Sequence, residues 1–309
     1  MGRVTGVLHG FVTLTVVIGV GWLLGHLRVL DLSAQRVLAE VAFQVGSPAL
    51  MITVLADADV RSLFSRNLIA TIAGVVVPVA IFVAAARLIW RLPLSQTVIG
   101  SLASAYVNAG NLGLPIAAYV LGDAALVAPT LLLQLIVIQP LALLLLDHDR
   151  KGGPFRWQQA VRRPLTNPLT LGALIGVALA ATGTTLPALI FDPLELIGGL
   201  AVPAMLIGYG VALRLGPRFG GGVPGQVALA SVLKMLIQPA TAYVAARWGL
   251  GMTGDELLAV TVTSALPTAQ NIFTHATRYR CGEALARDTI LVTTLGCLPV
   301  IALAATTLG

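Results

Sequence analysis

Two segments of the chain gather polar residues, glycine and proline inside otherwise apolar stretches. They are residues 108–115 (NAGNLGLP) and residues 264–271 (SALPTAQN). Inside a helix, glycine costs about 1 kcal/mol and proline about 3 kcal/mol relative to alanine, so both segments are predicted to be unwound. Unwound backbone and the helix N-termini beside it present free N–H groups, which favour an anion.

The side chains of these segments add neutral hydrogen-bond donors, and together with the free N–H groups they suit a small carboxylate. The predicted substrate-binding residues are Asn108, Asn111, Gly113, Pro267, Thr268, Gln270 and Asn271. The alternative is that both segments are ordinary kinks whose polar groups are hydrogen-bonded between helices. Breaks at equivalent positions of two repeats favour the binding site, because that pairing is typical of transporters.

Two ionisable residues near the segments could compensate charge or couple transport to an ion. Lys234 lies inside an apolar stretch, where an unpaired charge is expensive. It is interpreted as a fixed cation that holds the substrate or replaces a coupling ion, or else as a structural residue that snorkels or pairs with Glu40. His275 could carry a proton, because histidine titrates near neutral pH, or could be a packing residue. We expect no cofactor or metal, and coupling to Na⁺ or H⁺ stays open.

The composition indicates an integral membrane protein. Over 309 residues, 57% are hydrophobic, 10% are charged and the mean hydropathy is +0.91, whereas a soluble domain carries roughly a quarter charged residues. Ten apolar runs have the length of a membrane helix. They are residues 5–27, 37–56, 67–90, 97–121, 124–146, 168–187, 194–213, 225–247, 257–278 and 287–308. The predicted fold is an all-α integral membrane protein of ten transmembrane helices.

The basic residues predict the orientation. Fourteen Lys and Arg residues lie in the odd-numbered loops, four lie on the opposite side, and Lys234 lies within a span. Because cytoplasmic loops are enriched in Lys and Arg, residues 147–166 are predicted to be cytoplasmic and both termini to lie outside. The net charge of +6 sits in short loops, so the expected partner of these residues is anionic lipid and not nucleic acid. We expect the cytoplasmic (inner) membrane of a bacterium.

An internal repeat divides the chain. Arg87 and Arg247, Ser104 and Ser264, Asn111 and Asn271, and Gly122 and Gly282 are each 160 positions apart, and residues 48–52 recur at 203–207. This predicts a first five-helix repeat at 1–146, a cytoplasmic linker at 147–166 and a second repeat at 167–309. Five spans is an odd number, so the second repeat is inverted, as in many secondary transporters.

The chain resembles the auxin efflux carriers and their bacterial malonate or malate permease relatives, within the bile acid/auxin transporter superfamily. The resemblance extends over essentially the whole chain, and its most specific parts are residues 108–115 and 267–279. It implies a scaffold domain, a transport domain, helices four and nine that cross at their breaks, elevator-like movement and a homodimer. Asn108 matches the crossing asparagine, and Pro267 matches one crossing proline, whereas Val107 replaces the other proline of plant members.

We therefore predict a secondary transporter of small mono- or dicarboxylates that works by elevator-type alternating access. The alternative is an anion channel or an uncoupled carboxylate uniporter. An enzyme is not expected, because the chain has no HExxH or GxSxG motif and its four histidines are scattered.

Overall fold

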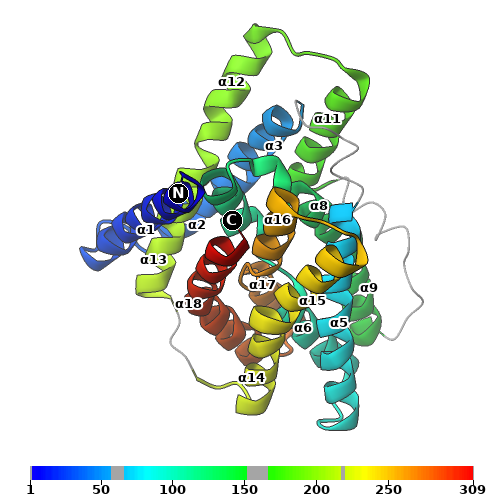
Figure 1. The fold of residues 1–309 in the computed structure, drawn as a ribbon. Coiled ribbons are helices and arrows are strands. Elements are labelled where there is room, and N and C mark those ends of the chain that lie inside the picture. The colour runs from blue at the N-terminus through cyan, green and yellow to red at the C-terminus, as the bar shows by residue number, and fades with distance from the viewer. Residues whose placement is uncertain (1, 57–65, 152–165, 217–219, 309) are drawn as a thin grey trace. The chain divides into compact units, whose positions relative to one another are not determined.

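The computed structural model describes residues 2–56, 66–151, 166–216 and 220–308, which are helical and contain no β-strand (Figure 1). The predicted all-α class is therefore confirmed. By its internal contacts the chain forms two compact units. Unit 1 comprises Met1–Phe64, Gly110–Leu132 and Pro164–Pro217, and unit 2 comprises Ser65–Ala109, Leu133–Arg163 and Arg218–Gly309.

Unit 1 contains α1, the helical run α2–η1–α3, the short elements from η2 to α8, and α11 to α13. Their bounds are α1 Gly2–His26, α2 Leu32–Val41, η1 Ala42–Gly46, α3 Ser47–Ala56, η2 Ala109–Gly113, α7 Leu114–Ile116, η3 Ala117–Leu121, η4 Ala124–Val127, α8 Ala128–Leu132, α11 Pro168–Thr182, α12 Ala188–Gly199 and α13 Ala201–Leu215. Within the unit, α1 packs on α13, and α3 packs on α11 and α12.

Glycines bring the helices of unit 1 close together. A Cβ atom added at Gly172 of α11 would lie 2.5 Å from the carbonyl oxygen of Pro48, and one at Gly176 would lie 2.7 Å from that of Met51. Gly21 of α1 and Gly210 of α13 likewise lie directly against the backbone of the facing helix. Small residues let helix backbones approach in lipid, where no hydrophobic effect drives helices together.

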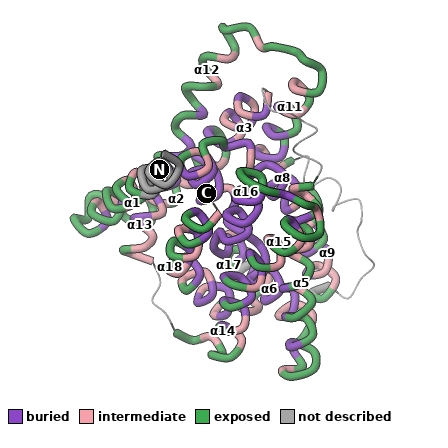
Figure 2. Tube along the Cα trace, in the orientation of Figure 1, coloured by how far each residue is buried: buried purple, intermediate pink, exposed green. Residues whose placement is uncertain are grey.

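Unit 2 contains α5, α6, η5, α9 and all the helices after Arg218. Their bounds are α5 Arg66–Leu88, α6 Leu94–Ala105, η5 Leu133–Ile138, α9 Gln139–Lys151, α14 Pro224–Val232, η7 Leu233–Ile237, α15 Gln238–Val244, η8 Ala245–Gly249, α16 Gly254–Ser264, α17 Asn271–Tyr279 and α18 Glu283–Leu308. Apolar clusters join α6 to α9, α17 and α18, and join α5 to α6 and α14. Buried residues are concentrated in α6 and α16 (Figure 2).

Helices long and apolar enough to cross a membrane occur at six places in the described residues. They are Leu32–Ala56, Arg66–Leu88, Ala124–Asp149, Ala188–Leu215, Pro224–Gly249 and Glu283–Leu308, and shorter apolar helices lie at Thr15–His26, Ala109–Leu121 and Pro168–Thr182. All ten predicted ranges coincide with mostly helical residues. These apolar helices indicate a membrane protein with several spans. That all ten predicted helices cross the bilayer remains a prediction.

The predicted repeats do not correspond to the two units, because each unit contains segments from both repeats. Helix α9 extends to Lys151, so the first residues of the predicted linker 147–166 are helical. Residues 152–165 lie outside the described residues. The equivalent glycines Gly122 and Gly282 both have positive φ, at 80° and 63°, which glycine adopts without steric cost.

Candidate substrate site at the helix crossing

The two predicted breaks meet in unit 2 as a short backbone crossing. Helix α6 ends at Ala105 and helix α16 ends at Ser264. Beyond these ends, Val107 and Thr268 form an antiparallel bridge. The N–H of Asn108 donates to Pro267 at 2.8 Å, and the N–H of Ala269 donates to Tyr106 at 3.1 Å. Each break therefore satisfies backbone groups of the other, as burial requires.

The first break is displaced from its predicted position. Residues 106–108 are extended or irregular, whereas Ala109–Gly113 form a helical turn and Leu114–Ile116 continue it. Pro115 lies within this helical run, in α7, so the run contains a proline without unwinding there. The prediction that residues 108–115 unwind was therefore wrong from Ala109 onward. The second segment is non-helical from Ala265 to Gln270, close to its prediction.

Lys234 is fully buried and lies beside the crossing. Its Nζ atom donates to the carbonyl oxygen of Ser264 at 3.0 Å. Ser264 is the last residue of α16, where carbonyl groups lack helical partners and the helix dipole favours a cation. Within the described residues no carboxylate forms an ion pair with Lys234, and the proposed partner Glu40 is exposed. The ammonium is therefore interior and does not snorkel to a surface.

Gln238 and Thr268 hold the end of the other helix, α6. The Nε2 atom of Gln238 donates to Ala105 at 2.9 Å, and the Oγ1 atom of Thr268 donates to Ala103 at 2.6 Å. Lys234 and Gln238 are four residues apart, so they lie on one face of their helix. The N–H of Thr268 also donates to the hydroxyl of Thr293 at 3.1 Å. The predicted residue Thr268 thus has its hydroxyl committed to the backbone.

A half-buried group of amides also lies at the crossing. The oxygen Oε1 of Gln139 accepts from the hydroxyl of Tyr106 at 3.0 Å and from Nδ2 of Asn271 at 3.4 Å. Gln270 precedes Asn271 and is also half-buried. His275 is half-buried one turn further along α17, on the same face as Asn271. These side chains are the accessible polar groups of the crossing.

The structure therefore brings together most predicted residues, but not all. Asn108, Pro267, Thr268, Gln270 and Asn271 belong to unit 2, as do Lys234 and His275. Asn111 and Gly113 belong to unit 1, so the unit 2 cluster is built without them. The interpretation from sequence singled out neither Tyr106 nor Thr293. Gln139 and Gln238 carried a signal, because glutamine is rare within apolar spans.

In the residues that the structure describes, long apolar helices surround an interior backbone crossing, which is typical of a multi-pass membrane transporter. The family model described as "Membrane transport protein" matches residues 7–154 and 155–305. The chain therefore belongs to this membrane transport family, which includes the auxin efflux carriers, and the resemblance drawn from the sequence is confirmed.

A relative from Rhizobium meliloti (strain 1021) carries the name "Putative malonate transporter". It is 24% identical to this chain over 254 residues, which cover 80% of this chain and 79% of the relative. The alignment therefore extends over most of both proteins.

Proposed function

We propose that the protein is a secondary carrier of small carboxylates, with a dicarboxylate of the malonate class as the first substrate to test. The observation that carries this proposal is the fully buried Lys234 beside the crossing. The name of the Rhizobium relative supports the substrate class.

Lys234 supplies positive charge where an anion is expected to bind. A lysine ammonium has three N–H donors, and Ser264 accepts one of them. A buried charge without an opposite charge costs on the order of several kcal/mol inside a membrane. A carboxylate substrate would offset this penalty, and the half-buried Gln139, Gln270 and Asn271 would bind its oxygens. The same ammonium would take the place of a coupling cation.

Transport would proceed by elevator-type alternating access, with unit 2 as the moving body and unit 1 as the scaffold. Two units that each have their own packing support this division. The arrangement as ten helices in two inverted repeats, with both termini outside the inner membrane and a homodimer through the scaffold, forms part of the same proposal.

The test is uptake of radiolabelled malonate, malate, lactate and an indole acid into proteoliposomes. Wild type is compared with two variants. Lys234→Arg keeps the positive charge, whereas Lys234→Gln keeps a hydrogen-bond donor but removes the charge. Loss of a charge-assisted hydrogen bond corresponds to a roughly 10- to 100-fold decrease in uptake at low substrate concentration. Saturable uptake and counterflow of at least one acid are expected for wild type.

Each result has a distinct meaning. Current proportional to driving force, without saturation or counterflow, would indicate the anion channel and overturn the carrier. Full uptake by Lys234→Gln, with loss of uptake by Asn271→Ala, would contradict the proposed role of Lys234 as a cation. It would still support a carboxylate carrier. Imposed H⁺ and Na⁺ gradients, with His275→Gln as the variant, test ion coupling; a response to H⁺ that vanishes in this variant assigns proton coupling to His275.

A further inference from the structure

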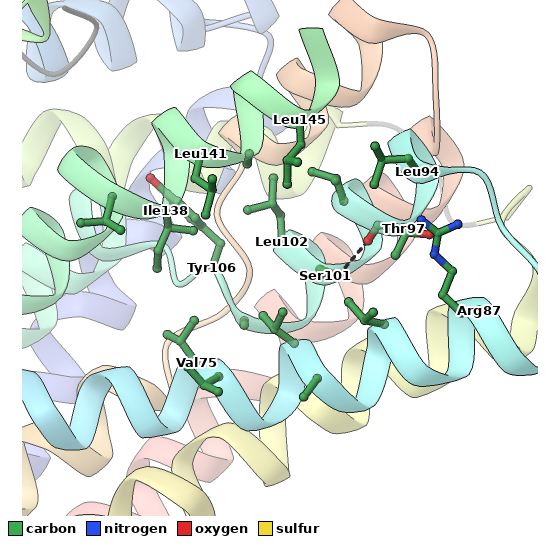
Figure 3. Close-up of a pocket in the computed structure, with 18 residues that line it drawn as sticks. Val75, Arg87, Leu94, Thr97, Ser101, Leu102, Tyr106, Ile138, Leu141 and Leu145 are labelled. Carbon is green, nitrogen blue, oxygen red and sulfur yellow. Dashed lines mark hydrogen bonds between the residues drawn. The ribbon is translucent and has the colours of Figure 1, made fainter. Parts of the chain in front are cut away.

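A cavity in unit 2 has no role in the proposed transport cycle. It has a volume of about 480 Å³ and lies between α5, α6 and the run from η5 to α9. Figure 3 shows α5 on one side, α9 on the other and α6 between them, with Arg87 at one end and Tyr106 towards the other. This volume is within the roughly 300–1,000 Å³ of ligand pockets.

The cavity wall is apolar even at its hydroxyl groups. Thr97 donates its hydroxyl hydrogen to the carbonyl of Pro93, the residue before α6, and Ser101 donates to Thr97 within α6. Tyr106 donates to Gln139. Because these donors are already used, the wall offers them to no ligand. The remaining lining is almost all aliphatic, from Val75 to Val83 on α5 and from Val137 to Leu145 along the run into α9.

Among the described residues that line the cavity, Arg87 is the only charged one. One of its N–H groups donates to the carbonyl of Leu92 at 3.3 Å, which holds the side chain at the cavity end. A guanidinium has five N–H donors, so several remain for a ligand. None of the lining residues that the structure describes is acidic, and Arg87 is exposed. The end of the cavity thus complements an anionic group.

The dimensions fit one leaflet of a bilayer. Val75 and Arg87 are twelve residues apart on α5, which is about 18 Å along a helix axis. One leaflet contributes roughly 15 Å of hydrocarbon. Val76, Val83, Val137 and Leu141 line the cavity and are exposed, so the cavity is open along its side. The loop after Arg87 is predicted to be cytoplasmic, where anionic lipids are abundant.

We propose that this cavity, the α5–α9 cavity, binds an acyl chain of an anionic membrane phospholipid whose phosphate contacts Arg87. Moving an acyl chain from the bilayer into an apolar cavity gives little selectivity, because lipid tails and leucine side chains are equally apolar. Preference for this lipid therefore comes from the headgroup and Arg87. The chain would end against Tyr106, whose hydroxyl holds Gln139 of the crossing.

The test is native mass spectrometry of the full-length protein, titrated with phosphatidylglycerol or with phosphatidylcholine of the same acyl chains. Wild type should bind phosphatidylglycerol more tightly. Arg87→Gln should weaken its binding roughly tenfold, as loss of a charge-assisted hydrogen bond predicts. Arg91→Gln is the matched control, since Arg91 is an exposed arginine in the loop that follows α5 and is not among the lining residues. Binding should change by less than about twofold in this variant, because the charge of an exposed arginine is screened by salt.

Ala80→Phe tests the acyl chain separately, because it fills the cavity from an exposed position and leaves Arg87 in place. It should abolish tight binding of phosphatidylglycerol. Leu141→Phe repeats this test from the opposite wall if the first variant does not fold. Equal binding of both lipids by wild type, or equal losses in Arg87→Gln and Arg91→Gln, would each overturn the lipid site.

Discussion

The two units of this protein hold their helices together in different ways. In unit 1, glycines such as Gly172 and Gly176 place one helix backbone against another. The partnered hydroxyl groups of Ser47 and Thr53 donate to carbonyls within their own helical run. In unit 2, the ends of α6 and α16 are open, and buried side chains from other helices satisfy them.

This difference indicates which unit carries the chemistry. Close backbone packing needs no polar group, so it suits a body that keeps its shape in lipid. Buried polar side chains at open helix ends are expensive to maintain in a membrane, and they are typical of a transport site. Four predictions, two of them with a matched control variant, test whether the two kinds of contact differ as described.

The largest expected effect is on the glycine packing of unit 1. Gly176→Val adds a Cβ atom that would lie 2.7 Å from the oxygen of Met51 and 2.8 Å from Cβ of Leu55. Overpacking of this kind costs about 1 to 3 kcal/mol, and the backbone contact favours the upper end. Thermal unfolding of the purified protein should show a clear decrease of the midpoint. An unchanged midpoint would mean that α3 and α11 do not pack at this distance.

Gln238→Leu should have the next largest effect, and it probes unit 2. The change removes the donor to Ala105 and leaves that buried carbonyl without this partner, at a cost of about 2 kcal/mol. The matched control is Gln134→Leu, which removes a buried amide nitrogen that lacks a partner and should cost less. Unfolding midpoints of the two variants are compared, and equal losses would contradict a capping role for Gln238.

Thr268→Val removes a hydroxyl that links two helices, whereas Thr53→Val removes one that only returns to its own helix. Thr268 donates to Ala103, 165 positions away in sequence, so its loss should cost about 1 to 2 kcal/mol. Thr53 donates to Ala49 and Leu50, carbonyls that the helix already uses, so the cost should be below about 0.5 kcal/mol. Carboxylate uptake should fall in Thr268→Val and stay near wild type in Thr53→Val. A larger loss of stability and uptake in Thr53→Val than in Thr268→Val would contradict the proposed difference between the units.

The smallest expected effect is a gain in stability. A Cβ atom added at Gly19 of α1 would meet no heavy atom within 4 Å. Gly19→Ala should therefore stabilise the helix by about 0.5 to 1 kcal/mol through the lower backbone entropy of the unfolded chain. A small rise of the unfolding midpoint is expected, and a fall would show that α1 meets a partner at this position.

Part of the candidate site could be predicted from residue types alone. Pro267 and the glycines of residues 108–115 signalled the breaks, and Lys234 stood out as a charge in an apolar stretch. The register of the first break could not be predicted, because tertiary packing can override the helix-breaking tendency of glycine and proline, and Ala109–Ile116 stays helical. Asn111 and Asn271 are equivalent in the repeat, yet they belong to different units.

The sequence by itself determined the membrane class, the positions of most helices and the family. Lipid offers no hydrogen-bond partner to backbone groups, so the membrane-spanning segments are long apolar helices, which can be recognised in the sequence. Only the tertiary structure decided which buried polar side chains contact which helix ends. Lys234 with Ser264, Gln238 with Ala105 and Thr268 with Ala103 are contacts between separate helices. Such partners depend on how the helices pack, because a side chain binds whichever free carbonyl the packing brings within about 3 Å.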